Sequence, residues 1–182
     1  MKISNQAKCG YAAGIVDGEG SICIRRKKIL GNGPKAGQIQ NYYMSVTVTQ
    51  KDGKLIDWLL GNFSGSTYLH WKGTNTGWSH EWILNHNKAK DFLKRIFPFL
   101  VYKKNQAELA IRFQERLDVF NNRKRERNEL GQFPKGTTGL SDHELETRKK
   151  MFEELKALKH IHEFSKAPNV QKRVQEGSIV QL

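Results

Sequence analysis

The alternation of apolar and polar residues predicts two β-hairpins in the first half of the chain. Residues 21–28 and 42–50 both alternate, and the turn-rich segment 31–37 joins them into a first hairpin. Residues 66–72 and 78–84 form a second hairpin around a turn rich in Gly, Thr and Asn. The first hairpin gathers its apolar side chains on one face: Ile22, Ile24, Met44, Val46 and Val48. The pattern therefore predicts an antiparallel sheet with one apolar face.

Helical periodicity surrounds these hairpins. Ser4 is placed to cap a helix that runs to about Asp17, and Asp52 to cap a second helix that carries an apolar stripe. A third helix opens at Asn87 and ends before a proline, and a fourth covers about 103–120. The expected order is α-β-β-α-β-β-α, so the fold class is α+β, with helices covering the apolar face of the sheet.

The chain divides into a predicted core, residues 1–120, and a charged segment, residues 121–182. We expect the second segment to be a linker and a helical extension of the same domain. Ser141 and Glu144 form a capping box for a helix in this extension. That helix places four larger side chains on one face: Met151, Leu155, Leu158 and His162.

The second face of the predicted sheet is basic and rich in hydroxyl groups. Alternation assigns to it a set of side chains that donate or accept hydrogen bonds: Arg25, Lys27, Tyr43, Ser45, Thr47, His70, Lys72, Ser79 and Glu81. On the third strand the assignment stays open, with Tyr68, His70 and Lys72 as the polar alternative and Leu69 and Trp71 as the core one. Such a face is suited to hold phosphates and read base edges, and a two-stranded ribbon fits the major groove. A merely solvated face is the alternative.

The net charge of the chain supports the interpretation of this face as a nucleic-acid-binding surface. The 182 residues include 31 Lys and Arg against 18 Asp and Glu, which gives a net charge of +13 and a pI near 9.8. This excess favours nucleic acid as a partner over the alternative of a generic basic protein. The chain has no run of about 18 apolar residues, so no membrane partner is expected. Cys9 and Cys23 form no CxxC pair, which predicts no zinc site and an intracellular, reducing location.

The most informative segment is Tyr11-Ala-Ala-Gly-Ile-Val-Asp-Gly-Glu-Gly20, in which a helix of small residues ends in Asp-Gly-Glu-Gly. An EF-hand loop that starts at Asp17 needs glutamate at its twelfth position, where Lys28 stands. A dinucleotide fingerprint is excluded because Cys23 replaces its last glycine and no strand precedes it. The segment is therefore neither of these two common ligand loops.

Residues 12–20 resemble the LAGLIDADG signature of homing endonucleases, with Ala12 in place of the leucine and Glu19 in place of the last aspartate. The resemblance implies a metal-dependent endonuclease that cuts double-stranded DNA at a specific site. Helices with such small side chains pack backbone to backbone when two copies meet. We therefore expect an interface between two copies at Ala13, Gly14, Asp17 and Gly18.

The resemblance also implies a metal cofactor. Two carboxylates that meet at the ends of paired helices repel each other unless cations lie between them. Hard oxygen ligands suit Mg²⁺, or Mn²⁺ in its place. We expect Glu19 to bind the metal with the Gly18 carbonyl as a second ligand, and Asp17 to support the end of the helix.

Residues 48–51 and 98–109 resemble the single-motif, homodimeric branch of this family. In that branch a strand-end glutamine, a basic residue just after it and a lysine before the last core helix line the active site and order its water network. The matching positions are Gln50, Lys54 and Lys103. A single motif implies a homodimer, hence a near-palindromic target of roughly 20 bp or more. The resemblance to the family also implies that cleavage leaves 3′ overhangs. We expect an intron-encoded homing enzyme.

Two other functions use the same fold. A maturase would bind intron RNA without cleaving DNA, and a transcriptional regulator would carry an added helix-turn-helix module. Glu19, Gln50 and Lys103 favour the nuclease, because RNA binding does not require them. Residues 121–182 predict one long amphipathic helix and no second one, which argues against the regulator.

Overall fold

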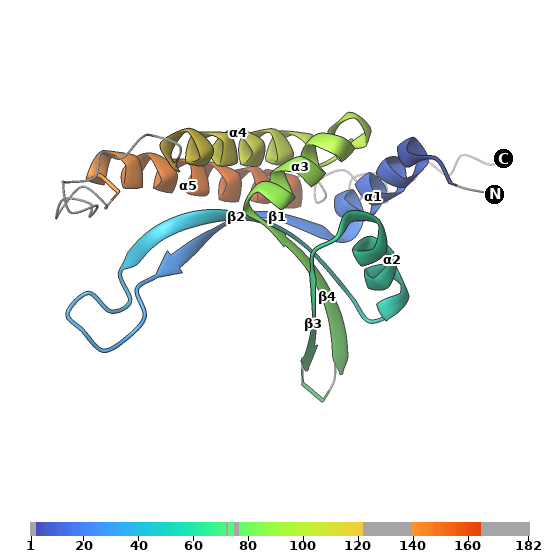
Figure 1. Ribbon diagram of the computed structural model, residues 1–182, viewed down its shortest axis with the longest axis horizontal. Helices are drawn as coiled ribbons and strands as arrows, with labels where there is room; N and C mark the ends of the chain where they lie inside the picture. Colours follow the sequence, from blue (N-terminus) through green and yellow to red (C-terminus); the bar gives the residue numbers. More distant parts are fainter. Residues whose placement is uncertain (1–2, 72, 75–76, 122–139, 165–182) are drawn as a thin grey trace, which may run out of the picture.

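The computed structural model describes residues 3–71, 73–74, 77–121 and 140–164, and in the last helix it describes side chains through residue 159. Figure 1 shows a curved antiparallel sheet with helices on one side. The elements are α1 (Asn5–Glu19), β1 (Gly20–Lys28), β2 (Ile39–Gln50), α2 (Gly53–Phe63), β3 (Ser66–Trp71), β4 (Trp78–Asn85), α3 (His86–Ile96), the 3₁₀ turn η1 (Phe97–Phe99), α4 (Lys104–Asn121) and α5 (Asp142–Phe164). The expected α+β class and order of elements are confirmed.

Polar side chains start three of the helices, as the sequence predicts. The Ser4 hydroxyl accepts a hydrogen bond from the Ala7 amide at 3.2 Å, and the Asp52 carboxylate accepts one from the Lys54 amide at 2.9 Å. The Ser141 hydroxyl accepts from the amide of Glu144 at 3.2 Å, so the cap of α5 is also in place. The third helix begins at His86, one residue earlier than predicted.

The strands lie in the order β1-β2-β4-β3, and every neighbouring pair is antiparallel. Because directly paired residues share a face, the register decides the open question on the third strand. Tyr68 pairs with Glu81, which in turn pairs with Thr49, so Tyr68 belongs to the polar face. Leu69 and Trp71 lie on the other face, yet each is 54% exposed.

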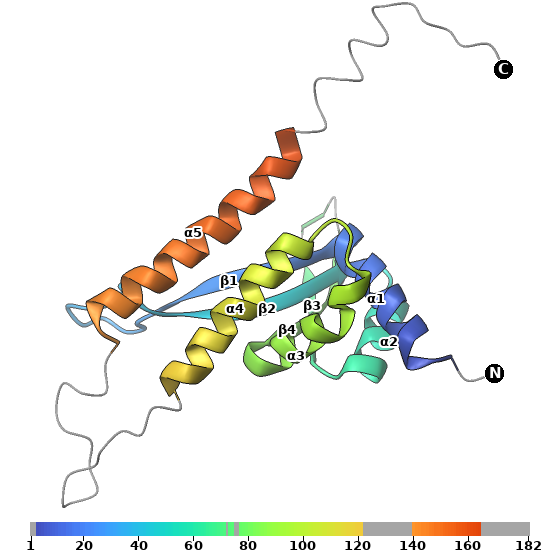
Figure 2. The same ribbon diagram turned by 90° about the horizontal axis from the view of Figure 1, so that it is seen from above.

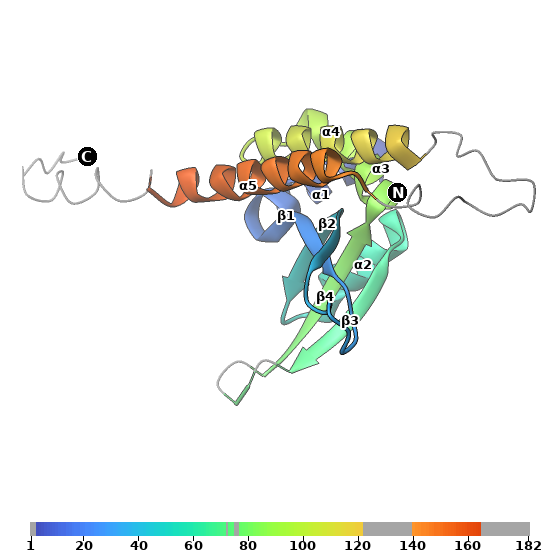
Figure 3. The ribbon, with the colours of Figure 1, turned by 90° about the vertical axis from the view of Figure 1, so that its left-hand side faces the viewer.

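The core lies between the sheet and the helices. The apolar face of β2 contributes Met44, Val46 and Val48, all fully buried, and α1, α3 and α4 supply the facing side chains. Figures 1 and 3 show both hairpins curving away from the helical layer, which leaves a concave polar face beneath the sheet. Leu69 and Trp71 stay exposed because their hairpin extends beyond this layer. No helix in the described ranges is long and apolar enough to cross a membrane.

The helix α5 packs against α4 and along the edge strand β1, as Figure 2 shows from above. Leu155 is 2% exposed and belongs to the core. Arg148 is 1% exposed and donates to the Glu144 carboxylate at 2.9 Å, and Arg116 of α4 donates to the same carboxylate at 2.6 Å. A buried ion pair and apolar contacts therefore hold α5 on the body of the protein. Most of the predicted linker before it lies outside the described residues.

Candidate active site

Asp17, the first acidic residue of the motif, has both carboxylate oxygens hydrogen-bonded within the chain. Its two carboxylate oxygens accept hydrogen bonds from the backbone amides of Val101 and Lys103, each at 2.8 Å. These amides lie just before α4, so Asp17 joins the end of α1 to the start of a helix more than 80 residues away. Both Asp17 oxygens thus accept a hydrogen bond within the chain, at the end of α1 that this residue was predicted to support.

The Lys103 side chain also binds the end of α1. Its ammonium donates hydrogen bonds to the carbonyl oxygens of Val16, Asp17 and Gly20, each at 2.8 Å. Burial lowers the pKa of Lys103 below its ordinary value, although the carboxylates of Asp17 and Glu19 act in the opposite direction. An ammonium has three N–H donors, and all three are used here. Lys103 therefore neutralises the negative end of the α1 dipole next to Glu19.

Glu19 differs from Asp17 in having an exposed carboxylate. Within the described part of the chain it makes no hydrogen bond or ion pair, although the charge of Lys103 lies near enough to interact with it. Figure 1 shows α1 running down to the start of β1, which is an edge strand of the sheet. The motif therefore presents one unused carboxylate at the place where α1 meets β1.

The exposed face of α1 carries glycines. Gly14 and Gly18 are exposed, and a Cβ atom added to either would meet no atom within 4 Å. Tyr11 is 56% exposed on the same helix. Ala13 is fully buried in the core, so its side chain faces the interior of this chain and not the glycine face. Of the four residues predicted at an interface, Gly14 and Gly18 are exposed, whereas Ala13 and Asp17 make contacts within this chain.

The predicted active-site residues Gln50 and Lys54 line one cavity, but Glu19 and Lys103 do not line it. Both line a surface cavity of about 580 Å³ that is also lined by Tyr11, Asp52, Leu55 and Trp58. The rings of Tyr11 and Trp58 meet edge to face, with their centroids 4.8 Å apart. The cavity therefore lies between α1, the end of β2 and α2. Glu19 and Lys103 are not among its lining residues.

On the first hairpin the polar face contains an ordered arginine. The Arg25 guanidinium donates from Nε to the Ser45 hydroxyl at 2.8 Å, and Ser45 itself is fully buried. Ser45 therefore orients Arg25 and is not open to a DNA base. Thr47 is 6% exposed, whereas Tyr43 is half-buried and Lys27 is exposed. The predicted residues of this hairpin share a face, but only some of them reach its surface.

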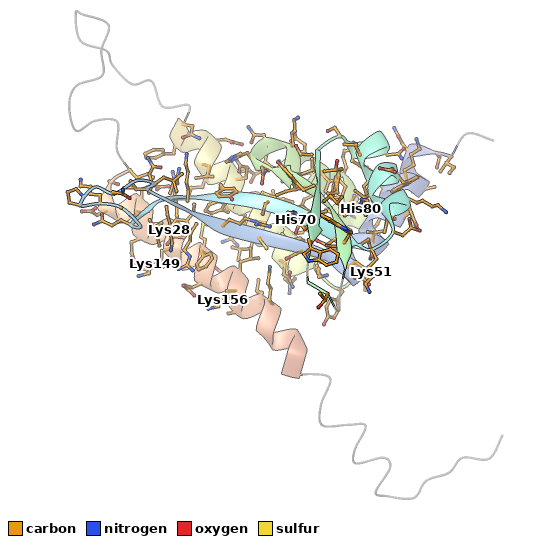
Figure 4. The ribbon with its side chains drawn as sticks, turned by 90° about the horizontal axis from the view of Figure 1, so that it is seen from below. Lys28, Lys51, His70, His80, Lys149 and Lys156 are labelled. Atoms are coloured by element: carbon orange, nitrogen blue, oxygen red, sulfur yellow. The ribbon has the colours of Figure 1, made fainter. Side chains whose placement is uncertain are left out.

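The second hairpin holds a polar pair on the same face. His70 and the Glu81 carboxylate are hydrogen-bonded at 2.9 Å, and the Tyr68 ring lies 6.1 Å from the His70 ring. Ser79 is 4% exposed, so it lies beneath the surface that it was expected to form. The prediction for Lys72 falls outside the described residues. Figure 4 shows His70 on this hairpin from the concave side.

Two features of this region cannot be predicted from the sequence. His86 has a φ of +53°, a left-handed conformation that side chains other than glycine seldom adopt. Its ring lies 5.5 Å from that of Tyr43, and both residues line a cavity of about 420 Å³ with Lys27 and Asn85. The second feature is Lys159 of α5, which reaches β1 near the motif. Both depend on how distant elements pack, which a local pattern does not reveal.

No family model and no curated protein matches the sequence. Solved structures do match. The archaeal intron-encoded homing endonuclease I-Vdi141I, solved with DNA, has a TM-score of 0.61 at 16% identity, covering 85% of this chain and 86% of that one. The chain has the homing endonuclease fold. I-CvuI, another homing endonuclease, was solved with uncleaved DNA in the presence of Mg²⁺ and gives a TM-score of 0.59 at 18% identity, over 85% of this chain and 83% of that one.

The two I-CvuI structures with this fold were solved with Mg²⁺ in one case and Ca²⁺ in the other. The described residues of this chain contain no group of three His, Cys, Asp or Glu side chains that could hold an ion. One chain offers the exposed Glu19 carboxylate and the adjoining backbone carbonyl of Gly18. These are hard oxygen donors of the kind that Mg²⁺ prefers. Their chemistry therefore fits such a cation, although one chain supplies few of the ligands that it needs.

Proposed function

We propose that this protein is a homing endonuclease that acts as a homodimer and makes a site-specific double-strand break in DNA, with Mg²⁺ or Mn²⁺ as cofactor. The observation that carries the proposal is the difference between the two acidic residues of the motif. Asp17 has both oxygens bound within the chain, whereas Glu19 is exposed and unpaired among the described residues. A carboxylate held free at a helix end is expected of a metal ligand and is unnecessary for binding RNA, so the difference favours a nuclease over a maturase.

The homodimer follows from the incompleteness of the site. One chain supplies one free carboxylate, and the exposed Gly14 and Gly18 allow a second α1 helix to approach closely. Pairing the two helices brings both Glu19 carboxylates to the dyad. The symmetry of such a dimer requires a target with near-palindromic halves.

The concave face is the proposed DNA-binding surface. Arg25, Lys27 and His70 line it with donors, and the +13 net charge favours binding to phosphates. Two copies side by side would extend the surface over roughly two turns of DNA, or about 20 bp. The proposal includes 3′ overhangs and an intron-encoded origin, as the resemblance of the motif implies.

The residues of the chain have separate tasks in this proposal. A bound divalent cation would supply charge stabilisation at the scissile phosphate. Glu19 would hold the cation, and Lys103 and Asp17 would fix the helix end that carries Glu19. Gln50 and Lys54, which line one cavity, would order water within it.

The first experiment is cleavage of a randomised duplex library with Mg²⁺, followed by sequencing of the ends. It tests activity, target and overhang together. With the target known, Glu19→Gln is expected to abolish cleavage in Mg²⁺ while leaving specific binding in Ca²⁺ within about threefold of the wild type, because only metal binding is lost. Glu108→Gln, an exposed change on α4, is the matched control. Full cleavage by Glu19→Gln would refute the role of Glu19.

The dimer is tested by Gly14→Leu, which adds a bulky side chain to the exposed face of α1. Sedimentation is expected to show a monomer with unchanged helical content. Gly61→Leu is the matched control, because Gly61 is also an exposed helical glycine with no atom within 4 Å of an added Cβ. A Gly14→Leu protein that remains dimeric would contradict the proposed interface.

A further inference from the structure

The last helix places a lysine beside the motif. The Lys159 ammonium donates hydrogen bonds to the Ser21 hydroxyl at 3.2 Å and to the Cys23 sulfur at 3.0 Å. Ser21 and Cys23 follow Glu19 by two and four residues, and they pair with Thr47 and Ser45 on the polar face. Because β1 is the edge strand, a side chain from α5 reaches around it to that face. Lys159 is therefore a cation that α5 adds to the region of Glu19.

The partners of Lys159 are neutral. Several other basic residues of the helices are paired with carboxylates, among them Lys90 with Asp118 and Lys94 with Glu115. In the described part of the chain Lys159 has a hydroxyl and a sulfur as acceptors and no carboxylate. Its positive charge is thus uncompensated and only half-buried. A charge of this kind is suited to an anion that arrives from outside the protein.

Lys159 also differs from Lys103 in its remaining hydrogen-bond capacity. All three N–H donors of Lys103 are bound by carbonyl groups of α1 and β1. Lys159 uses two of its three on Ser21 and Cys23. The two ammonium groups are near enough to interact: burial lowers the pKa of Lys103, and the charge of Lys159 lowers it further. Of these two lysines, Lys159 keeps one N–H donor that no described residue accepts.

We propose that Lys159 binds a DNA phosphate next to the scissile bond and stabilises the charge that develops there during cleavage. The C-terminal helix is then part of the nuclease centre and not only a support for the sheet. The inference rests on the proposed nuclease function. It assigns a role in cleavage to a residue that lies outside both the motif and the predicted core, residues 1–120.

The test compares Lys159→Gln with Lys159→Arg in the full-length protein. Glutamine keeps a donor for Ser21 but removes the charge, whereas arginine keeps the charge. Lys156→Gln is the matched control, because Lys156 lies on the same helix (Figure 4) and lines one cavity together with Cys23 and Lys159. Single-turnover cleavage, binding in Ca²⁺ at several salt concentrations and thermal unfolding are measured for each variant.

Lys159→Gln is expected to slow single-turnover cleavage about 100-fold, the lower end of the range of roughly 100- to 1,000-fold found for loss of one donor to a developing charge. The dependence of affinity on salt should become less steep by about 1–2 in log–log slope, one phosphate contact for each subunit. Lys159→Arg should keep most of the rate, and Lys156→Gln should cleave within about twofold of wild type.

Three results would overturn the inference: wild-type cleavage by Lys159→Gln, equal slowing by the arginine variant with an unchanged salt slope, or equal slowing by the Lys156 control. The second would show a structural role, and the third a diffuse basic surface. These outcomes differ from a failure of the proposed function, because in that case the wild-type protein itself would cleave no DNA.

Discussion

Replacing Asp17 with alanine should destabilise the protein, whereas replacing Glu19 should not. Asp17 accepts hydrogen bonds from the backbone amides of Val101 and Lys103, so alanine leaves two donors at the start of α4 without their acceptor. It also removes the negative charge beside the Lys103 ammonium. Glu19 makes no such contact in the described part of the chain, so its removal leaves nothing unpaired.

The size of the effect follows from the contacts. A hydrogen bond to a charged group contributes about 1.5–3 kcal/mol. Two such bonds at a half-buried site, partly replaced by water in the variant, give a loss of about 2–4 kcal/mol in the free energy of unfolding. For a chain of this length that corresponds to a melting temperature lower by about 5–15 °C. Asp17→Asn should fall between wild type and alanine, because the amide keeps one acceptor but turns a donor toward the second N–H.

Urea unfolding monitored by circular dichroism measures these differences. Glu19→Ala, two residues away, is the control and should lie within about 0.5 kcal/mol of wild type. If Asp17→Ala were equally stable, the hydrogen bonds between α1 and the start of α4 would not hold the fold together. If Glu19→Ala were as damaging as Asp17→Ala, the division of roles between the two acidic residues would be wrong.

Two further predictions concern a glycine and a buried ion pair. Gly20→Ala should destabilise the protein by about 1–3 kcal/mol, because the added Cβ would lie 2.7 Å from the Val16 Cα atom. Gly18→Ala is the control, because its Cβ would meet no atom within 4 Å. Thermal unfolding of the two variants measures the difference. Burial acts to raise the pKa of Glu144, but the hydrogen bonds from its two arginine partners outweigh it and hold that pKa below 4.5. The ionised Glu144 carboxylate therefore stabilises the folded protein fully above the ordinary pKa of 4.5. This stabilisation is lost as the pH falls through the lower pKa that Glu144 has in the folded state. Glu144→Gln should therefore be less stable than wild type at neutral pH, since Arg148 stays buried without a charge partner, and the difference should shrink below pH 4.5.

Each of these predictions has a result that contradicts it. Equal melting temperatures for the two alanine variants would mean that the backbone at Gly20 adjusts without cost. A constant gap between wild type and Glu144→Gln from neutral to acidic pH would show that Glu144 does not contribute through its ionisation.

Much of the fold and part of the site are predictable from local sequence. The strands follow from alternation, and three helix starts follow from Ser4, Asp52 and Ser141, because a cap acts on amides two or three residues away. On the third strand alternation gave two choices, and only pairing with β4 assigned Tyr68 to the polar face. Burial was also beyond local reasoning, since Ser45 has the right parity for the surface but lies beneath Arg25.

The sequence by itself determined the α+β order, the polar face and the segment in which the two acidic residues lie. Only the tertiary structure decided which of the two is free. Asp17 and Glu19 look alike in the motif, but the amides that bind Asp17 come from a loop 84–86 residues later in the chain. Lys159 reaches Cys23 across 136 residues. Local patterns are set by neighbours within a few positions, whereas these contacts exist only once α4 and α5 have packed on the sheet.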